Sequence, residues 1–418
     1  MTKITDIPAI RFKGFSDTWE QRKLSEIATM HARIGWQNLR TSEFLDSGDY
    51  MLITGTDFID GAVNFDTCHY VERERYEQDK HIQIRNGSIL ITKDGTLGKV
   101  AYIQGLTMPA TLNAGVFNVE IKDENEVDNR YLFQYLKAPF LMDYVDKKAT
   151  GGTIKHLNQN ILVDFPVVLP HKAEQEKIGE YFLAIDHLIT LHQRKYDKLT
   201  NVKKSMLEKM FPQNGSNVPE IRFKGFTEAW EQRKFSDLVQ IERGGSPRPI
   251  DDFITDSPDG LNWVKIGDAP AQGNYITKTA EKIKPEGLSK TREVHPGDLI
   301  LSNSMSFGKP YIMGIDGCIH DGWLLIRNTY KVFDLTFLCH LLGTPQMIIQ
   351  YKSLAAGSTV NNLNKELVGN TVVTIPTIKE QRVLGQYLET LDNLITLHQR
   401  ELEKLKNLKK ACLEKMFV

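Results

Sequence analysis

The chain has 418 residues, with 52 Lys and Arg against 53 Asp and Glu and a formal net charge of −1. This length exceeds what one hydrophobic core usually supports, so two or more domains are expected. No apolar run approaches the roughly 18 residues of a membrane span, and the N-terminal residues lack the apolar core of a signal peptide, so we expect a cytoplasmic protein without membrane association.

The chain repeats itself in two long blocks. Pro8–Ile27 (PAIRFKGFSDTWEQRKLSEI) returns as Pro219–Leu238 (PEIRFKGFTEAWEQRKFSDL). Residues 149–211, from ATGGTIKHLNQ to LEKMF, return as residues 355–417, and the phrase LITLHQR is unchanged between these two copies. The segments between the blocks share little. Repeated blocks on either side of unlike segments predict that the whole architecture is duplicated. In a solenoid the sequence similarity would instead be spread evenly along each repeat.

The unlike segments contain short β-rich runs separated by glycine and Asp-Gly turns. These runs are Met51–Phe58, Gly87–Ile103 and Gly115–Ile121 in the first half, and Leu261–Ala269, Gly297–Met313 and Gly322–Asn328 in the second. A helical stretch follows each set, at Asn129–Val145 and at Asp334–Lys352. The fold class we expect is therefore α+β, with two mixed α/β domains that are each followed by a long helix.

Neither half carries a recognisable catalytic or metal-binding motif. DGTLGK at Asp94–Lys99 lacks the spacing of a phosphate-binding loop, and a β-hairpin turn is the favoured interpretation. The four cysteines, Cys68, Cys318, Cys339 and Cys412, form no CxxC pair, so plain buried thiols are expected instead of a zinc site or a disulfide framework. The sequence predicts no enzymatic activity and no metal.

A heptad pattern begins shortly after Pro170 and again after Pro376, and each run is about 38 residues long, or roughly 57 Å as a helix. We expect the first helix to run from about Lys172 to Met210. The heptad positions that would face a partner helix form what we call the seam. They include Ile185, Ile189, His192 and Leu199 in the first copy, and Leu391, Ile395, His398 and Leu405 in the second. The matched register favours a coiled coil between the two helices. The alternative is that each helix packs on its own domain as an ordinary amphipathic helix.

His192 and His398 occupy equivalent seam positions, as do Lys203 and Lys409. A polar seam residue commonly fixes register, and this interpretation is favoured over a metal or catalytic histidine pair because no third ligand stands at a fixed spacing. A parallel pair would juxtapose Lys203 with Lys409, so we expect an antiparallel pair. The two histidines should then meet, while Lys203 should approach the neighbourhood of Tyr387.

Several of these segments together resemble the specificity subunit of type I restriction-modification systems. The segments are WEQRKLSEI at Trp19–Ile27, the GSILITKDGTLGKV hairpin, the TGGTIKHLNQ turn, the FPVVLPHKAEQEKI lead-in and the long helix. The resemblance covers the whole chain twice. It implies a target-recognition domain at residues 1–168, a spacer helix at 169–212, a second target-recognition domain at 213–374 and a second spacer helix at 375–418, with the spacers paired antiparallel in pseudo-two-fold symmetry.

The resemblance also implies partners. Such subunits bind one bipartite double-stranded DNA target and recruit two modification subunits, and restriction subunits can join them. S-adenosylmethionine and Mg-ATP would then belong to the partner subunits, and this chain would hold no cofactor of its own. Because the two domains differ in sequence, their half-sites should differ, and antiparallel helices would hold two readers apart along a duplex whose turn is roughly 34 Å.

The expected DNA-binding residues are Arg, Lys, Asn, Ser, Thr, His and Trp side chains on predicted loops and turns. They are Arg33, Trp36, Lys93, Thr96, Lys99, Thr153, Lys155 and His156 in the first half, and Arg243, Arg248, Ser302, Asn303, Lys309, Thr359 and Asn361 in the second. Residues in the unlike segments, such as Arg33 and Arg248, are expected to specify sequence, and those in the shared turns, such as Thr153 and Thr359, to touch phosphate or shape the fold. A solvated loop residue is an equally good interpretation for each.

Two other functions remain open. The near-zero net charge counts against nucleic-acid binding, which usually leaves a basic surplus. The chain could instead be a pseudo-symmetric scaffold whose two domains bind proteins. It could also serve a methylation-only system, which its sequence does not distinguish from a restriction system.

Overall fold

A computed structural model describes residues 2–3, 8–34, 38–148, 157–213, 215–303, 308–355 and 363–417. The chain forms two compact units, one of Met1–Leu191 with Glu403–Val418 and the other of His192–Leu402. Each of the two long helices contributes one part to each unit. In the described part of the chain, no helix combines the length and the apolar character that a bilayer crossing requires.

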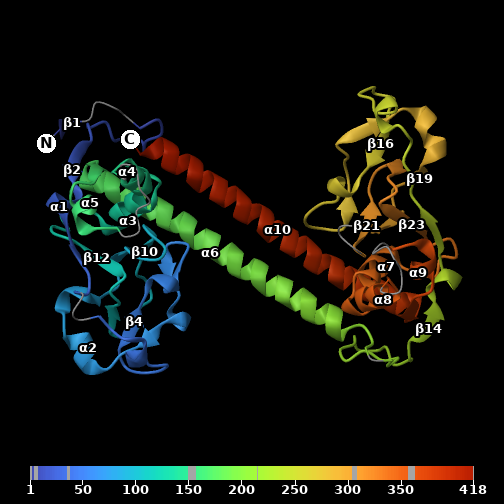
Figure 1. The fold of residues 1–418 in the computed structure, drawn as a ribbon, viewed down its shortest axis with the longest axis horizontal. Coiled ribbons are helices and arrows are strands. Elements are labelled where there is room, and N and C mark those ends of the chain that lie inside the picture. Colours follow the sequence, from blue (N-terminus) through green and yellow to red (C-terminus); the bar gives the residue numbers. More distant parts are fainter. Residues whose placement is uncertain are drawn as a thin grey trace. The chain divides into compact units, whose positions relative to one another are not determined.

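The first unit is built from small sheets and short helices (Figure 1). Its strands are β1 (Thr2–Lys3), β2 (Glu20–Lys23), β3 (Ala28–His31), β4 (Met51–Ile53), β5 (Phe58–Ile59), β6 (Ala62–Val63), β7 (His69–Tyr70), β8 (Gln83–Ile84), β9 (Ile89–Thr92), β10 (Val100–Tyr102), β11 (Ala110–Leu112), β12 (Val116–Ile121) and β13 (Pro166–Leu169). Its short helices are α1 (Leu24–Ile27), α2 (Arg73–Glu77), α3 (Asn129–Lys137), α4 (Phe140–Lys148) and α5 (Gln159–Val163). The sheet orders are β1-β2-β13, β10-β9-β12-β3, β7-β4-β11-β8 and β5-β6.

The second unit repeats this plan. Its strands are β14 (Glu231–Lys234), β15 (Gln240–Arg243), β16 (Leu261–Val264), β17 (Tyr275–Ile276), β18 (Glu281–Ile283), β19 (Arg292–Val294), β20 (Leu299–Ser302), β21 (Pro310–Met313), β22 (Gly317–Ile319), β23 (Trp323–Arg327) and β24 (Val372–Ile375). Its short helices are α7 (Leu335–Leu342), α8 (Pro345–Ala355) and α9 (Lys365–Gly369). The order β15-β23-β20-β21 matches β3-β12-β9-β10, and β18-β16-β22-β19 matches β7-β4-β11-β8. The two predicted α/β domains are therefore present.

Each predicted helical stretch is divided at a proline. Ala138 and Pro139 separate α3 from α4, and Pro345 begins α8 three residues after α7 ends at Leu342. Proline has no backbone N–H to donate to the preceding turn, and its ring crowds the backbone before it, so a helix stops there and a new one starts.

The long helices are α6 (Lys172–Lys209) and α10 (Ile378–Met416). The first matches its predicted range to one residue. Within the first unit, Tyr181 contacts Cys412 and Asp186 contacts Lys409. Within the second unit, His192 contacts His398 and Lys203 contacts Asp392. In each unit the partner number falls as the residue number rises, so the two helices run antiparallel there.

The repeated LEKMF phrase closes the core of the opposite domain. Phe417, at the end of the second copy, packs in the first unit against Tyr131 and Phe182, with ring centroids 5.6 and 5.7 Å apart. Phe211, at the end of the first copy, packs in the second unit against Trp230 and Phe337, at 6.1 and 5.7 Å. Each helix thus starts against its own domain and ends in the core of the other.

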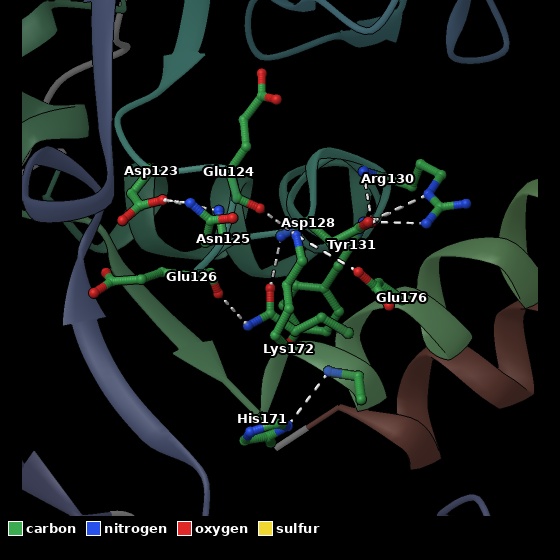
Figure 2. Close-up of polar contacts among 12 residues, drawn as sticks. Asp123, Glu124, Asn125, Glu126, Asp128, Arg130, Tyr131, His171, Lys172 and Glu176 are labelled. Atoms are coloured by element: carbon green, nitrogen blue, oxygen red, sulfur yellow. Dashed lines mark hydrogen bonds and ion pairs between the residues drawn. The ribbon is translucent and has the colours of Figure 1, made fainter.

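A buried glutamine fixes the start of each long helix to its domain. In the first unit, the Gln175 side chain accepts from the backbone N–H of Asp128 at 2.9 Å and donates to the carbonyl of Glu126 at 3.0 Å. Figure 2 shows the surrounding contacts, in which the Lys172 Nζ donates to the carbonyl of Glu124 at 2.7 Å. Gln381 makes the equivalent bonds in the second unit, with the N–H of Asp334 and the carbonyl of Val332.

An ion pair beside each glutamine adds to this anchor. Arg11 donates to both carboxylate oxygens of Glu174 at 2.7 and 2.8 Å, and Arg222 does so to Glu380 at the same distances. Both glutamates are buried. Two parallel charge-assisted bonds fix direction as well as distance, so the helix angle is set where each domain joins it.

Candidate nucleic-acid interface and helix seam

In the first unit, three of the expected DNA-binding residues lie on one hairpin turn. Strands β9 and β10 pair antiparallel, and Lys93, Thr96 and Lys99 lie in the turn between them. This confirms the hairpin interpretation of DGTLGK. Thr96 and Lys99 are exposed, while the Lys93 amine lies 5.5 Å from the centre of the Phe117 ring.

A buried threonine makes this turn rigid. The Thr92 hydroxyl donates to the carbonyl of Thr96 and accepts from the backbone N–H of Lys99 at 3.0 Å. Gly98 takes a positive φ of 71°, which few other residues adopt without strain. The turn therefore presents the Thr96 and Lys99 side chains from a fixed backbone, as a nucleic-acid contact requires.

Arg33 has a different place from the one expected. Its side chain is buried, and its guanidinium donates to the carbonyl of Leu112 at 3.0 Å, to Gln78 at 3.1 Å and to the carbonyl of Arg75 at 3.3 Å. Burial, with repulsion from Arg75, lowers the pKa of Arg33. Because the Arg33 guanidinium donates its hydrogen bonds inside the domain, it is not presented to a DNA groove. In this structure the side chain links separate segments of the domain.

In the second unit, two expected arginines lie around Asp321. The Arg243 Nε lies 3.5 Å from the backbone carbonyl of Asp321, and the Arg248 guanidinium lies 3.9 Å from its carboxylate. The Ser246 hydroxyl donates to the same carboxylate at 3.1 Å. The Arg248 side chain is 82% exposed, so this contact leaves most of its guanidinium open to a ligand.

The loop that carries Arg248 borders a cleft of about 900 Å³, whose other lining residues include Trp263, Lys265 and His320. A Cβ on Gly244 would lie 2.2 Å from the carbonyl oxygen of His320, so glycine allows the loop to run against this turn. The lining also includes the carboxylates of Asp251 and Glu281. Because Glu281 pairs with Lys265, the exposed Arg248 guanidinium is the lining cation best placed to meet a phosphate.

The remaining expected residues of the second unit are less available. Ser302 and Asn303 are buried, and the Asn303 amide donates to the carbonyl of Asp321 at 2.8 Å. These two shape the domain from within and are not placed as surface contacts. The Lys309 amine lies 4.9 Å from the centre of the Tyr311 ring, and the residue is half-buried.

Six expected residues lie outside the described part of the chain. They are Trp36, Thr153, Lys155, His156, Thr359 and Asn361.

Sequence reasoning missed the other members of the cleft. Ser246 stands in the GGSPRP segment next to Arg248. The glycine pair of this segment, which allows a close approach of two backbones, could have pointed to it in the sequence. Lys265 and His320 come from separate strands and turns, and only the tertiary fold brings them beside Arg248.

The predicted histidine contact is confirmed in the second unit. The Nδ1 atoms of His192 and His398 lie 3.1 Å apart, and the ring centroids are 5.1 Å apart. Burial, together with the nearby His192 and Lys195, lowers the pKa of His398. The other six expected seam residues are buried or half-buried: Ile185, Ile189, Leu199, Leu391, Ile395 and Leu405.

The Lys203 amine forms an ion pair with Asp392, five residues after Tyr387 on the facing helix. This carboxylate compensates the charge of the amine within the seam. Lys409 makes the equivalent pair in the first unit, with its amine 2.6 and 2.8 Å from the two carboxylate oxygens of Asp186. The two aspartates occupy equivalent positions in the two copies of the repeat, so the same lysine–aspartate pair occurs once in each unit.

The comparisons with known proteins agree with this architecture. A family model described as the type I restriction modification DNA specificity domain matches residues 16–201 and 227–407. The MjaVIII type I restriction enzyme specificity subunit of Methanocaldococcus jannaschii is 24% identical over 347 residues, covering 79% of this chain and 78% of that protein. A putative MjaX specificity subunit of the same organism is 23% identical and covers 98% of this chain and 93% of its own length.

Structural similarity extends over nearly the whole chain. The type I restriction-modification S subunit from M. genitalium superposes with a TM-score of 0.68 at 14% identity, over 98% of this chain and 99% of that one. Since the family model covers both halves of the sequence, the chain belongs to the type I restriction-modification specificity subunit family.

Proposed function

We propose that this protein reads a bipartite, asymmetric double-stranded DNA target, with one domain for each half-site. The observation that carries the proposal is the duplicated anchor. Gln175 with Glu174 and Gln381 with Glu380 fix two domains to two long helices in the same way, while the surfaces those domains present are unlike. Two domains that are attached to the helices in the same way but present different surfaces suit a target with two different half-sites at a fixed spacing.

The candidate contacts in each domain follow from exposure. In the first domain, Thr96 and Lys99 project from the rigid hairpin turn, with Lys93 half-buried beside them. In the second domain, Arg243, Arg248 and the cleft beside them offer guanidinium groups, which recognise phosphate and guanine edges well. These groups provide local positive charge in a chain whose net charge is −1.

We also propose that the long helices bind two modification subunits and that restriction subunits can join them. Leu188 and Leu191 on α6, and Leu394 and Leu397 on α10, are exposed although they lie in otherwise amphipathic helices. Pairs of exposed leucines on one helical face are suited to a protein partner. In this proposal S-adenosylmethionine and Mg-ATP belong to the partner subunits, the chain is not itself an enzyme, and the complex works in the cytoplasm.

A salt titration of duplex binding tests the DNA role. We expect the affinity of the full chain, with its modification partner, to fall steeply with salt, because each neutralised phosphate releases counterions. Arg248→Ala and Lys99→Ala should each reduce the slope, whereas Lys195→Ala, an exposed helix residue in the second unit, should leave it unchanged. Binding that is absent at low salt would instead support the protein-binding scaffold.

Methylome sequencing of cells that carry this chain and its partner tests the bipartite target. One asymmetric motif with two half-sites and a fixed spacer supports the proposal, and a continuous motif contradicts it. The purified chain alone should transfer no methyl groups and should cleave neither DNA nor ATP. Methylated but uncleaved foreign DNA would identify the methylation-only alternative.

A further inference from the structure

Three potential metal ligands meet on one face of the first unit. They are His31 at the end of β3, His81 in the short 3-10 turn at Lys80–Ile82, and Glu120 in β12. One ligand atom from each lies within 4.8 Å of the other two. We infer that His31, His81 and Glu120 hold a divalent transition-metal ion, a site independent of the proposed DNA function.

The backbone places these groups by pairing and not by sequence spacing. β12 pairs antiparallel with β3, with Asn118 directly opposite His31. Directly opposed residues share a face of the sheet, and Glu120 lies two residues from Asn118 on that same face. The turn with His81 lies over this face, because the backbone carbonyl of His81 accepts from the Asn118 amide at 3.0 Å.

Asn118 fixes two of the three ligands at once. It is fully buried, and its amide nitrogen also donates to the Glu120 carboxylate at 3.2 Å. The side-chain amide oxygen of Asn118, Oδ1, is buried without a hydrogen-bond partner among the described residues. A buried amide that orients a carboxylate and a histidine backbone is the kind of outer support that metal ligands receive.

The His31 and His81 rings are stacked on each other in this structure. The His31 and His81 rings have centroids 4.5 Å apart and planes 21° from parallel. An ion between them requires the ring planes to turn so that two nitrogen lone pairs converge. The torsion that turns an imidazole is broad and soft, so this adjustment is small in energy.

The equivalent position of the second unit holds a glutamate instead of a histidine. Glu242 stands four residues after Leu238, as His31 stands four residues after the equivalent Ile27. Glu242 pairs with Arg292 at 3.0 Å and Arg327 at 3.7 Å, so the charges are balanced by protein groups.

The first unit has no such balance. Within the described residues Glu120 forms no ion pair, and its carboxylate contacts are limited to the Asn118 amide. His31 stands where the second unit has Glu242, so the first unit has an imidazole, a metal ligand, in place of that carboxylate. A cation bound here would supply the missing positive charge.

The ligand set selects the class of metal. Two imidazoles and one carboxylate favour Zn²⁺, Co²⁺ or Ni²⁺ over Mg²⁺ and Ca²⁺, which prefer oxygen ligands. Three protein ligands leave one tetrahedral position for water. The ion would tie β3 and β12 to the turn that carries His81, which lies beside the bonds that Arg33 makes to Arg75 and Gln78.

Cobalt titration of the full-length, chelator-treated chain tests the site. We expect one Co²⁺ per chain, with visible ligand-field absorption typical of a four-coordinate nitrogen and oxygen site. His81→Ala and Glu120→Gln should each weaken binding by about 100-fold or more, and Asn118→Ala by about 10- to 100-fold. His187→Ala removes an exposed histidine of the same unit from α6 and should bind as the unchanged protein does.

Thermal unfolding with and without Zn²⁺ gives a second readout. Zn²⁺ should raise the unfolding temperature of the unchanged chain and of His187→Ala, but not of His81→Ala, because only ligand binding to the folded state stabilises it. Glu120→Gln keeps an oxygen for Asn118 and so separates loss of a ligand from loss of folding. No uptake by the unchanged chain, or equal uptake after His31→Ala and His81→Ala are combined, would overturn the proposal.

Discussion

The Asp392 carboxylate receives three partners in the seam of the second unit. The Lys203 amine pairs with it, the His340 Nε2 lies 2.9 Å from it, and the Asn274 amide donates to it at 2.8 Å. Burial acts to raise the pKa of Asp392, but the hydrogen bond from His340 and the charge of Lys203 outweigh it, so the pKa lies below its usual 3.8. The ionised form is therefore the one that the fold stabilises.

Asp392→Asn should destabilise the protein by about 3–5 kcal/mol at pH 7, because it leaves Lys203 and His340 without their charged partner. A folded-state pKa below the unfolded one contributes stability that is present above pH 3.8 and is lost as pH falls through the folded pKa. The difference between variant and unchanged protein should thus shrink below pH 3.8 in denaturant titrations. Asp197→Asn on exposed α6 surface is the matched control, and an equal loss there would contradict the prediction.

Lys409 predicts a pH dependence of the same sense in a higher pH window. Burial, with repulsion from Lys137, lowers its pKa to about 8 despite the attraction of Asp186. Between that value and the usual 10.5 the unfolded chain holds a proton that the folded chain has lost, so the free energy of unfolding rises with pH in this window.

Relative to Lys409→Met, the unchanged protein should gain up to about 3 kcal/mol between pH 8 and 10.5. Denaturant midpoints of both proteins at several pH values measure this gain. A constant difference across the window would show that Lys409 does not titrate there.

At the scale of the elements, a glycine allows each long helix to contact its domain. A Cβ on Gly179 in α6 would lie 2.8 Å from the Tyr131 backbone nitrogen, and one on Gly385 in α10 would lie 2.9 Å from that of Phe337. Both approaches are closer than real Cβ contacts, so the helix lies directly on the N-terminus of α3 or α7.

Gly179→Ala should therefore destabilise the chain by about 1–3 kcal/mol, because the added methyl group overpacks the contact, although alanine by itself favours a helix by about 1 kcal/mol. Thr200→Ala introduces the same residue at an exposed position of α6 and should be neutral or slightly stabilising. Chemical denaturation compares the two. A stabilised Gly179→Ala protein would mean that the helix can move away from α3 without cost.

Two exposed leucines on α10, Leu394 and Leu397, are proposed to contact the modification subunit. Leu394→Glu combined with Leu397→Glu should reduce binding of the modification subunit by at least about 100-fold, because each leucine contributes roughly 1.5–3 kcal/mol when it is buried. Co-purification and calorimetric titration measure the loss. Asn407→Glu, an exposed change on the same helix, should bind normally, and normal binding by the double variant would remove the leucines from the interface.

At the scale of the whole molecule, the unlike segments should be exchangeable. Replacing residues 28 to 148 with the same segment of a relative should change one half-site and preserve the other, since the repeated frames with Gln175 and Glu174 stay in place. Methylome sequencing before and after the exchange measures both half-sites. A change in both would contradict the assignment of one domain to one half-site.

The sequence by itself determined the duplication, the two α/β domains and the antiparallel seam with His192 facing His398. These follow from local signals, because heptad spacing, strand alternation and repeated phrases are periodic along the chain. The sequence also suggested a helix start near Lys172, which the structure has. It did not suggest that α6 and α10 would each enter the core of the opposite domain through Phe211 and Phe417.

Only the tertiary structure decided the environment of individual polar groups. Arg33 was expected at the surface, and folding buried it against Leu112 and Gln78, because residues 42 to 79 positions away in sequence supply its acceptors. His31, His81 and Glu120 carry no spacing motif, and they meet because β3 pairs with β12 beneath the turn that carries His81. Such contacts depend on strand pairing between distant segments, which no local pattern encodes.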